Sequence, residues 1–362
     1  MTHADLIARY DGRVPRYTSY PTAPHFSAEI GAAHYQRWLA ALPEASPLSL
    51  YLHVPFCDRL CLYCGCHTSV ARHERPKRIY AEALAREIGL LADILGRRAR
   101  VSQIHWGGGT PTALPDDCLT SLMALLRTRF DVAADAEIAI EIDPVALSPD
   151  KLATLGRMGI NRASLGVQDF DEAVQAAIGR PQSFAQTQDA AQGLRALGVT
   201  SLNLDLIYGL PLQTEASVAR TARLALALSP DRVAVFGYAH VPWMKKHQAL
   251  IPRPPCLTRS RACTRKPRSG TCSNRRVGCC PSASIITPGP RTRWPRPCGP
   301  ARCNAASRDI WSMPRRSCSG LAPAPLVRYL GLCADPAAHS RLRGSRLQRP
   351  PADRTRLRSA AR

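Results

Sequence analysis

The sequence predicts an α/β fold: a partial (βα)6 barrel with parallel strands, followed by a mostly irregular C-terminal tail. Three observations carry this prediction. Between residues 48 and 238, short apolar segments alternate with longer amphipathic segments, which is typical of a parallel sheet with helices outside. Five strand–helix repeats followed by a sixth strand fall short of the eight units of a complete barrel. Polar motifs follow the strands, where a parallel barrel gathers its active site. A doubly wound open sheet is the structural alternative.

The elements are expected in a regular order. Strands are predicted at 48–54, 101–106, 136–142, 162–167, 202–208 and 232–238. Between them, helices are predicted at 77–98, 116–130, from 148, 184–197 and 215–228. The helix at 116–130 has an acidic first turn, which suits the positive end of the helix dipole. Ser148 followed by Pro149 is a typical helix start. Residues 1–47 read as a lead-in with one helical stretch at 28–42.

The net charge divides the chain in two. Residues 1–251 hold 25 Lys and Arg against 24 Asp and Glu, whereas residues 252–362 hold 24 Lys and Arg, three Asp and no Glu. The second part also contains 16 Pro and nine Cys. We therefore expect three regions: the lead-in at 1–47, a (βα)6 core at 48–251 and the tail at 252–362.

The tail has two interpretations. An Arg-, Pro- and Cys-rich stretch that begins abruptly is what a GC-rich gene yields when it is read out of frame, so a frameshift is one hypothesis. A natural disordered basic tail is the alternative. A basic tail that binds DNA, with or without zinc, would give salt-sensitive affinity, but we expect no nucleic-acid partner.

The first chemical motif is a set of closely spaced cysteines directly after the first strand. Cys57, Cys61 and Cys64 have C-x3-C-x2-C spacing, and Cys66 follows. Thiolates on one tight loop can bind three corners of an iron–sulfur cube. A zinc site with Cys66 as the fourth ligand and plain buried thiols are the alternatives.

Polar or glycine-rich motifs also follow the later strands. Gly107, Gly108 and Gly109, followed by Thr110, allow a close backbone approach to a ligand. Glu141 and Asp143 are two residues apart, so they should share a strand face, where a carboxylate could bind ribose hydroxyls. The remaining candidates at or after strand ends are Gln168, Arg180, Asp205 and Ala239. Such a set at one mouth favours a binding site.

In combination, these motifs resemble one family. The Cys57–Cys64 spacing, with Tyr63 before the last cysteine, is similar to the radical S-adenosylmethionine (SAM) signature. The residues 51–57, Cys66, 107–111, 166–170, 205–211 and 237–242 resemble oxygen-independent coproporphyrinogen III oxidases, and so does the lead-in at 16–23. The resemblance covers roughly residues 9–250.

The resemblance implies specific roles for these residues. Cys57, Cys61 and Cys64 would bind a [4Fe–4S] cluster, and Cys66 would line the site without being a ligand. One SAM molecule would bind the open iron and contact Tyr51, Gly108 and Glu141. A second SAM molecule would contact a further set: Tyr63, Gly109, Thr110, Gln168, Arg180, Asp205 and Ala239.

The implied reaction is the oxidative decarboxylation of two propionates of coproporphyrinogen III to vinyl groups, which gives protoporphyrinogen IX in haem biosynthesis. Arg16 and Arg180 are candidate cations for the substrate carboxylates. We expect a cytoplasmic monomer with an unidentified electron donor and no membrane partner. Residues 1–10 have no apolar core of a secretory signal, and no apolar stretch is long enough to span a membrane.

Two rivals remain close to this interpretation. The haem-chaperone branch of the same family usually lacks a cysteine at the position of Cys66 and has a shorter N-terminus, so Cys66 and residues 16–23 favour the oxidase. An inactive product is the second rival. The family continues into a final barrel helix and a C-terminal domain, and residues 252–362 have no pattern that predicts either.

Overall fold

The computed structural model describes residues 29–251, together with two short strands at 284–286 and 329–332. Its centre is one eight-stranded sheet with the order β10-β1-β4-β5-β6-β7-β8-β9. The six central strands are β1 (Leu48–Val54), β4 (Arg100–Gly108), β5 (Asp131–Ile142), β6 (Arg162–Gln168), β7 (Ser201–Tyr208) and β8 (Arg232–Gly237). Each is parallel to its neighbours among these six.

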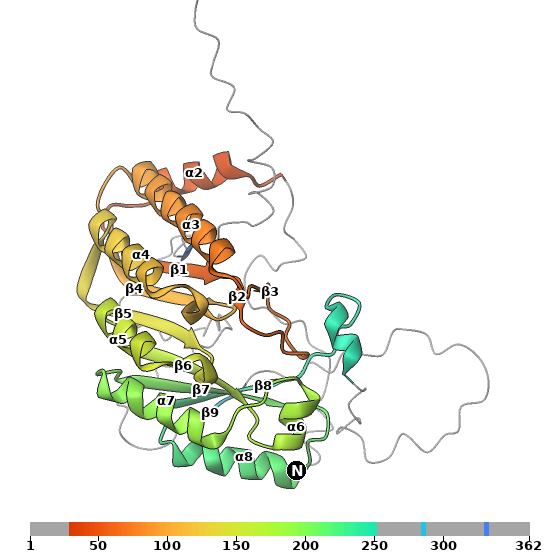
Figure 1. The fold of residues 1–362 in the computed structure, drawn as a ribbon. Coiled ribbons are helices and arrows are strands. Elements are labelled where there is room, and N and C mark those ends of the chain that lie inside the picture. The colour runs from red at the N-terminus through yellow and green to blue at the C-terminus, as the bar shows by residue number, and fades with distance from the viewer. Residues whose placement is uncertain (1–28, 252–283, 287–328, 333–362) are drawn as a thin grey trace, which may run out of the picture.

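These six strands confirm the predicted parallel (βα)6 core. Because their order along the sheet is their order along the chain, the sheet has no point at which the strand order reverses, as a doubly wound sheet would have. The helices that connect them lie along one side of the curved sheet (Figure 1). They are α3 (Glu74–Leu95), α4 (Asp116–Arg129), α5 (Pro149–Met158), α7 (Phe184–Ala196) and α8 (Glu215–Ala227).

Local sequence accounts for where several helices begin. The Ser148 side chain accepts a hydrogen bond from the N–H of Lys151 at the start of α5, as predicted for an N-cap. Asp116 and Asp117 occupy the first turn of α4. Ser183 and Gln186 form a capping box at the start of α7. The predicted N-terminal helix is shorter than expected, since α2 spans Ala32–Ala40.

Three features were not predicted. A short helix, α6 (Glu172–Ala177), follows β6, and two short strands, β2 (Phe56–Cys57) and β3 (Ser69–Val70), pair in parallel at the base of the cysteine-containing loop. β5 begins five residues earlier than the alternation indicates. In addition, β9 (Ser284–Ile286) pairs antiparallel with β8, and β10 (Tyr329–Leu332) pairs in parallel with β1. The C-terminal part of the chain thus contributes both edge strands.

The two faces of the sheet differ sharply in polarity. The face toward the helices is the main core, with Leu50, Leu52, Trp106, Leu165 and Leu204 at 0 % exposure. The alternate residues of the same strands face the other way and are polar. They include Ser49, Tyr51, His53, Gln103, His105, Glu137, Glu141, Arg162, Ser164, Asn203 and Asp205. A shift of one residue would exchange the faces, so the apolar core fixes which side chains enter the barrel interior.

An ion pair between a buried arginine and a half-buried glutamate lies in this interior. Arg162 Nη1 is 2.8 Å from Glu137 Oε1, and the Arg162 side chain is 3 % exposed. Asn203 donates to both Ser164 Oγ and Asp205 Oδ1 at 2.7 Å. Such hydrogen bonds offset the cost of burying polar groups. Within the described residues, no helix is long and apolar enough to cross a membrane.

Candidate functional site

The cysteine loop, defined here as residues 57–68, connects β2 and β3 at the carboxyl end of the sheet. Its four cysteines are free thiols, with Cys61 buried, Cys57 and Cys64 half-buried and Cys66 exposed. The hydroxyl of Thr110, which follows β4, donates to Cys57 Sγ at 3.7 Å. Inside the loop, the Cys64 N–H donates to the Cys61 carbonyl at 3.1 Å. The loop therefore folds as a tight turn beside the glycine motif.

The thiols of this loop differ in acidity. Burial is the main cause that raises the pKa of Cys57 to about 11; the hydrogen bond from Thr110 opposes this shift, and the neighbouring thiols of Cys64 and Cys61 add to it. A hydrogen bond from the Cys66 side chain lowers the pKa of Cys64 to about 6. Metal ligands must be deprotonated, so a bound cation would release a proton from Cys57 in particular.

The glycine motif leaves no room for side chains. A Cβ on Gly109 would lie 2.6 Å from the Phe56 carbonyl oxygen and 3.1 Å from Cys57 Sγ. Gly108 has a φ of 115°, and a Cβ there would lie 2.7 Å from the His53 ring. At Gly107 a Cβ would meet the Glu141 carboxylate at 2.9 Å. The backbone at these glycines is thus pressed against the cysteine loop and the polar face of the sheet.

Glu141 and Gly108, which the resemblance assigns to one SAM molecule, are in direct contact. The Gly108 N–H donates to Glu141 Oε2 at 3.0 Å. The Tyr51 hydroxyl is 3.1 Å from His53 Nδ1, and its ring is 5.6 Å from the ring of His105. Burial, together with the positive charge of Arg162, lowers the pKa of His105 to about 3, so this imidazole is neutral.

Asp143 does not join Glu141. It follows the end of β5, and its carboxylate pairs with Arg59 at 3.2 Å and with Arg180 at 3.1 Å. Their spacing predicted that the two carboxylates share a strand face, but they bind different partners. The reason is that the chain turns into a short 3-10 helix, η3 (Pro144–Ala146), at Asp143. Asp143 is held by two guanidinium groups, a role for which its sequence context gives no signal.

Arg180 is buried at the centre of the site. Its Nη1 donates to Cys61 Sγ at 3.3 Å, and its Nη2 donates to the Gly166 carbonyl at 2.7 Å. Its Nε is buried and has no hydrogen-bond partner. With Asp143, Gly166 and Cys61 bound, the guanidinium faces the cysteine loop.

The other candidate residues are placed as follows. Gln168 ends β6 with a φ of 68°, a backbone conformation that is costly for a side-chain-bearing residue and clusters at functional sites. Its amide lies next to Arg180 against Gly166. Burial raises the pKa of the Tyr63 hydroxyl well above its usual value. Asp205 accepts from Ser164 and Asn203. Ala239 is exposed on the loop after β8, and Arg16 lies outside the described residues.

The neighbouring Asp169 has a structural role. It is 0 % exposed, and its carboxylate accepts hydrogen bonds from Thr221, Gln213 and the N–H of Asp171. These bonds hold the turn after β6 against α8. Asp169 therefore supports the backbone next to Gln168. None of these contacts directs its carboxylate toward the cysteine loop.

The three cysteines fit an iron–sulfur cluster. No group of three or more His, Cys, Asp or Glu side chains in the described part of the chain is arranged around a single-ion position. Ligands of a cube bind different iron atoms and so lie farther apart than ligands of one ion. An anionic cluster with thiolate ligands suits the free thiols, the Arg180 guanidinium and the glycine motif at 107–109, called the glycine cradle below. Cys66 is exposed and its carbonyl is bound by Lys245.

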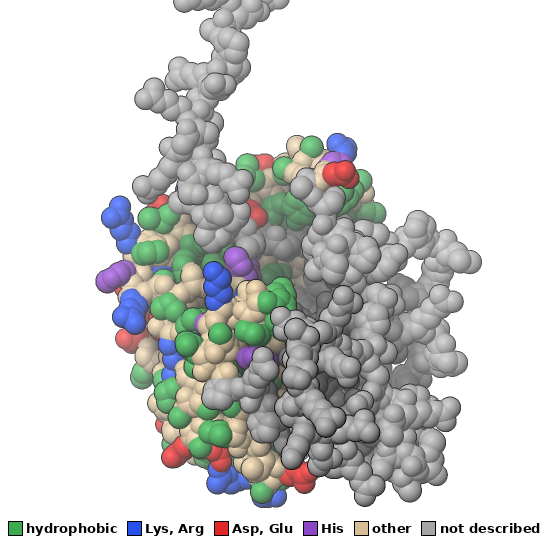
Figure 2. All heavy atoms as spheres, turned by 90° about the vertical axis from the view of Figure 1, so that its right-hand side faces the viewer, with side chains coloured by type: hydrophobic (Ala, Val, Ile, Leu, Met, Phe, Trp, Pro, Cys, Tyr) green, Lys and Arg blue, Asp and Glu red, His purple; other side chains and the backbone are tan. Residues whose placement is uncertain are grey.

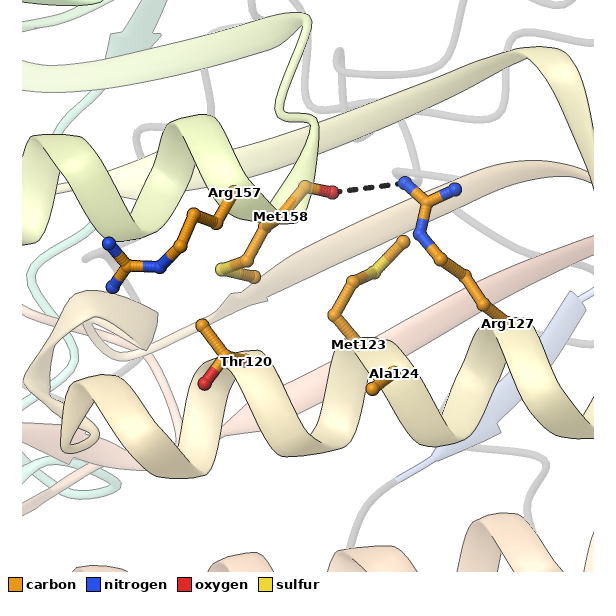
Figure 3. A pocket seen from close by; sticks show the side chains of 6 residues that line it. All are labelled: Thr120, Met123, Ala124, Arg127, Arg157 and Met158. Carbon is orange, nitrogen blue, oxygen red and sulfur yellow. Dashed lines mark hydrogen bonds between the residues drawn. The ribbon is translucent and has the colours of Figure 1, made fainter.

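A separate hollow of about 390 Å³ lies on the helical layer between α4 and α5. Figure 3 shows Met123 and Met158 at its floor, with Arg127 donating to the Met158 carbonyl at 3.2 Å. Thr120, Ala124 and Arg157 complete its lining. It lies on the opposite side of the sheet from the polar interior and contains no residue of the candidate site.

Sequence reasoning missed Arg59, Asp143, Lys245, His247 and Gln248 as residues that contact this loop or its partners. Arg59 Nη1 donates to the Pro181 carbonyl at 3.0 Å. His247 Nε2 lies 2.8 Å from the Cys64 carbonyl. A polar residue whose partner lies 84 positions away, as for Arg59 and Asp143, or 185 positions away, as for Gln248 and Tyr63, leaves no local pattern, so no sequence signal could have identified these contacts.

Comparisons with known proteins agree with this geometry. Residues 51–225 match the model of the Radical SAM superfamily. The chain is 53 % identical over 249 residues to the oxygen-independent coproporphyrinogen III oxidase of Bradyrhizobium diazoefficiens, covering 68 % of this chain and 55 % of the relative. It is 47 % identical over 246 residues to the Escherichia coli enzyme of that name, covering 68 % and 53 %.

The solved structures give the same picture. The E. coli coproporphyrinogen III oxidase, described as a radical SAM enzyme, superposes with a TM-score of 0.65 at 43 % identity, covering 70 % of this chain and 57 % of that one. The chain spans about half the length of the curated relatives it matches. Residues 51–225, with the cysteine loop and the glycine cradle, therefore form a domain of the Radical SAM superfamily.

Proposed function

We propose that this chain catalyses the oxygen-independent oxidative decarboxylation of coproporphyrinogen III to protoporphyrinogen IX, a step of haem biosynthesis. The observation that carries the proposal is the coincidence of the cysteine loop and glycine cradle with 53 % identity to a coproporphyrinogen oxidase across both. Because the chain spans about half of that relative, the activity is inferred for the core that the two share.

In this proposal Cys57, Cys61 and Cys64 bind a [4Fe–4S] cluster. When bound there, the cluster would supply the reducing electron that radical chemistry on SAM needs. The chain's own residues orient that molecule. Gly108 and Glu141 are already joined by a hydrogen bond, and a ligand amine at this edge would meet the Glu141 carboxylate. Tyr51 lies beside Gly107 and closes this side.

A second SAM molecule would bind between Cys57 and Arg180. The residues proposed for it are Tyr63, Gly109, Thr110, Gln168, Arg180, Asp205 and Ala239. The buried Nε of Arg180, which has no hydrogen-bond partner, supports a ligand carboxylate here. The strained backbone of Gln168 supports it as well. Measuring SAM stoichiometry by anaerobic equilibrium dialysis tests the number: two per chain is expected, and one would contradict it.

The polar barrel interior would receive the substrate side chains away from bulk water. Arg180 is committed to Cys61, Asp143 and Gly166, so these contacts do not support it as the cation for the propionates. Arg16 keeps that proposed role. An oxygen-sensitive cluster on free thiols requires a reducing compartment, which supports a cytoplasmic location. A monomeric state and a separate electron donor are further parts of the proposal.

The test is anaerobic turnover of the full chain. After reconstitution with iron and sulfide, dithionite, SAM and coproporphyrinogen III are added, and porphyrins are separated by chromatography after oxidation. Protoporphyrin IX should form, and a Cys61→Ala variant should form none. If the reconstituted chain binds SAM but leaves coproporphyrinogen unchanged, the proposed activity is wrong for this chain, while the radical SAM domain stands.

A further inference from the structure

Three polar side chains that follow β8 reach the second half of the cysteine loop. Lys245 Nζ donates to the Cys66 carbonyl at 2.7 Å, and Gln248 Nε2 donates to the Tyr63 carbonyl at 2.8 Å. His247 Nε2 lies 2.8 Å from the Cys64 carbonyl. Because a carbonyl can only accept, His247 must carry its proton on Nε2. The segment 241–251, called the clasp below, thus binds three carbonyls within four residues of the loop.

The clasp is a built element rather than a surface contact. It contains the 3-10 helix η4 (Lys246–Leu250). Gln248 is 1 % exposed, and its Oε1 accepts from the Val241 N–H at 2.6 Å while its Nε2 binds the loop. Ile251 is buried in a small apolar cluster that Leu62 and Tyr63 of the loop also join. Figure 1 shows the clasp directly beside the loop that follows β2.

The first half of the loop is anchored elsewhere. The Leu62 N–H donates to the Ile178 carbonyl at 2.9 Å, at the end of α6. Arg59 binds the Pro181 carbonyl and Asp143. These contacts fix the backbone around Cys61, but they do not reach residues 64–66. The clasp contacts begin where the contacts to α6 end, so each half of the cysteine loop has its own support.

We propose that Lys245, His247 and Gln248 are positioning residues that hold the cysteine loop in the conformation in which Cys64 binds the cluster. The proposal rests on the radical SAM domain and not on the substrate. It extends the cluster site beyond residue 225, where the superfamily match ends. A cluster ligand is only as well oriented as the groups that hold its backbone. Without the clasp, the Cys64 carbonyl and thiolate are free to turn together.

The clasp face carries both charge and apolar surface. Trp243, Met244 and Leu250 are exposed there, and Figure 2, which views this side of the molecule, shows hydrophobic side chains interspersed with cationic ones and histidines.

Lys246 is exposed and is one residue from Lys245. No hydrogen bond to the cysteine loop involves Lys246 in the described part of the chain, so it is the matched control for Lys245.

The experiment uses the full chain, reconstituted anaerobically with iron and sulfide. The variants His247→Leu, Lys245→Ala and Gln248→Leu are compared with the parent and with Lys246→Ala. Three readouts are taken: iron per chain, the EPR spectrum of the reduced cluster, and the rate at which a chelator removes iron. The three clasp variants should lose iron several-fold faster and give broadened EPR spectra, whereas Lys246→Ala should match the parent.

A conservative replacement separates positioning from general packing. His247→Gln retains an N–H donor near the position of Nε2, so it should restore the parental EPR spectrum and chelation rate that His247→Leu loses. Equal behaviour of His247→Gln and His247→Leu, or parental values for all the clasp variants, would overturn the proposal. Circular dichroism of the apoproteins identifies a variant that fails to fold. In that case the comparison of His247→Leu with His247→Gln decides the proposal, because the His247 side chain is only half-buried and its replacement should leave the fold intact. None of these readouts depends on coproporphyrinogen turnover.

Discussion

Arg180 Nη1 lies 3.3 Å from the sulfur of Cys61, although the two residues are 119 positions apart. The same guanidinium forms an ion pair with Asp143, and Arg59 of the cysteine loop pairs with this carboxylate as well. Hydrogen bonds to a cluster ligand sulfur are one of the means by which a protein sets the reduction potential. Because the donor is a buried cation, it stabilises the more negative, reduced state of a cluster on Cys61.

Replacing Arg180 by glutamine should therefore make the midpoint potential of the cluster more negative. A loss of about 1.4 kcal/mol of differential stabilisation corresponds to about 59 mV for one electron. An EPR-monitored redox titration measures the potential. Arg220→Gln, which breaks an exposed ion pair with Asp171, is the control and should leave the potential unchanged. A potential equal to that of the parent would show that the Arg180–Cys61 contact does not tune the cluster.

Gly109→Ala should abolish cluster binding. The added methyl group would lie 2.6 Å from the Phe56 carbonyl and 3.1 Å from Cys57 Sγ, so either the backbone or a cluster ligand must move. Iron content and the charge-transfer absorption of the reconstituted protein check this. Gly65→Ala is the matched control, because it lies in the cysteine loop and its Cβ would meet nothing within 4 Å. Equal iron content in the two variants would contradict the close approach seen at Gly109.

In the apoprotein, Cys64 should be the more reactive thiol at neutral pH. Its pKa is lowered to about 6 by the hydrogen bond from the Cys66 side chain, whereas burial raises the pKa of Cys57 to about 11. The thiolate is the nucleophile, so alkylation of Cys64 should rise with a midpoint near pH 6. Peptide mapping by mass spectrometry after timed iodoacetamide treatment measures it. Cys66→Ala should move the midpoint to higher pH; an unmoved midpoint would exclude Cys66 as the cause.

His105 should make the fold less stable as the pH falls. Burial lowers its pKa to about 3, whereas an unfolded histidine titrates near 6.5. Between these values the unfolded state binds the extra proton, so the free energy of unfolding should fall by about 1.4 kcal/mol per pH unit as pH decreases below 6.5. Urea unfolding at several pH values shows the slope. His105→Asn should have a shallower slope by this amount, and identical slopes would refute the assignment.

The sequence by itself determined the strand order, and it supplied the residues from which the site is proposed. Alternation of apolar and polar residues along β4, β6 and β7 sufficed, because the apolar residues can face only the helices. The spacing of Cys57, Cys61 and Cys64 and the three glycines after β4 sufficed to predict a cluster site, since both motifs are local. The frameshift and nucleic-acid hypotheses for the tail concern residues that lie almost entirely outside the described ones.

Only the tertiary structure decided which polar groups meet around that loop. Asp143, expected from its spacing to share a strand face with Glu141, binds two arginines, and Gln248 reaches Tyr63 across 185 positions. Gln168 adopts its strained backbone conformation although its local sequence contains no turn residue that requires it. The physical reason is common to all three. A hydrogen bond between distant residues depends on how closely packed elements bring them together, and the chain's local pattern carries no record of that distance.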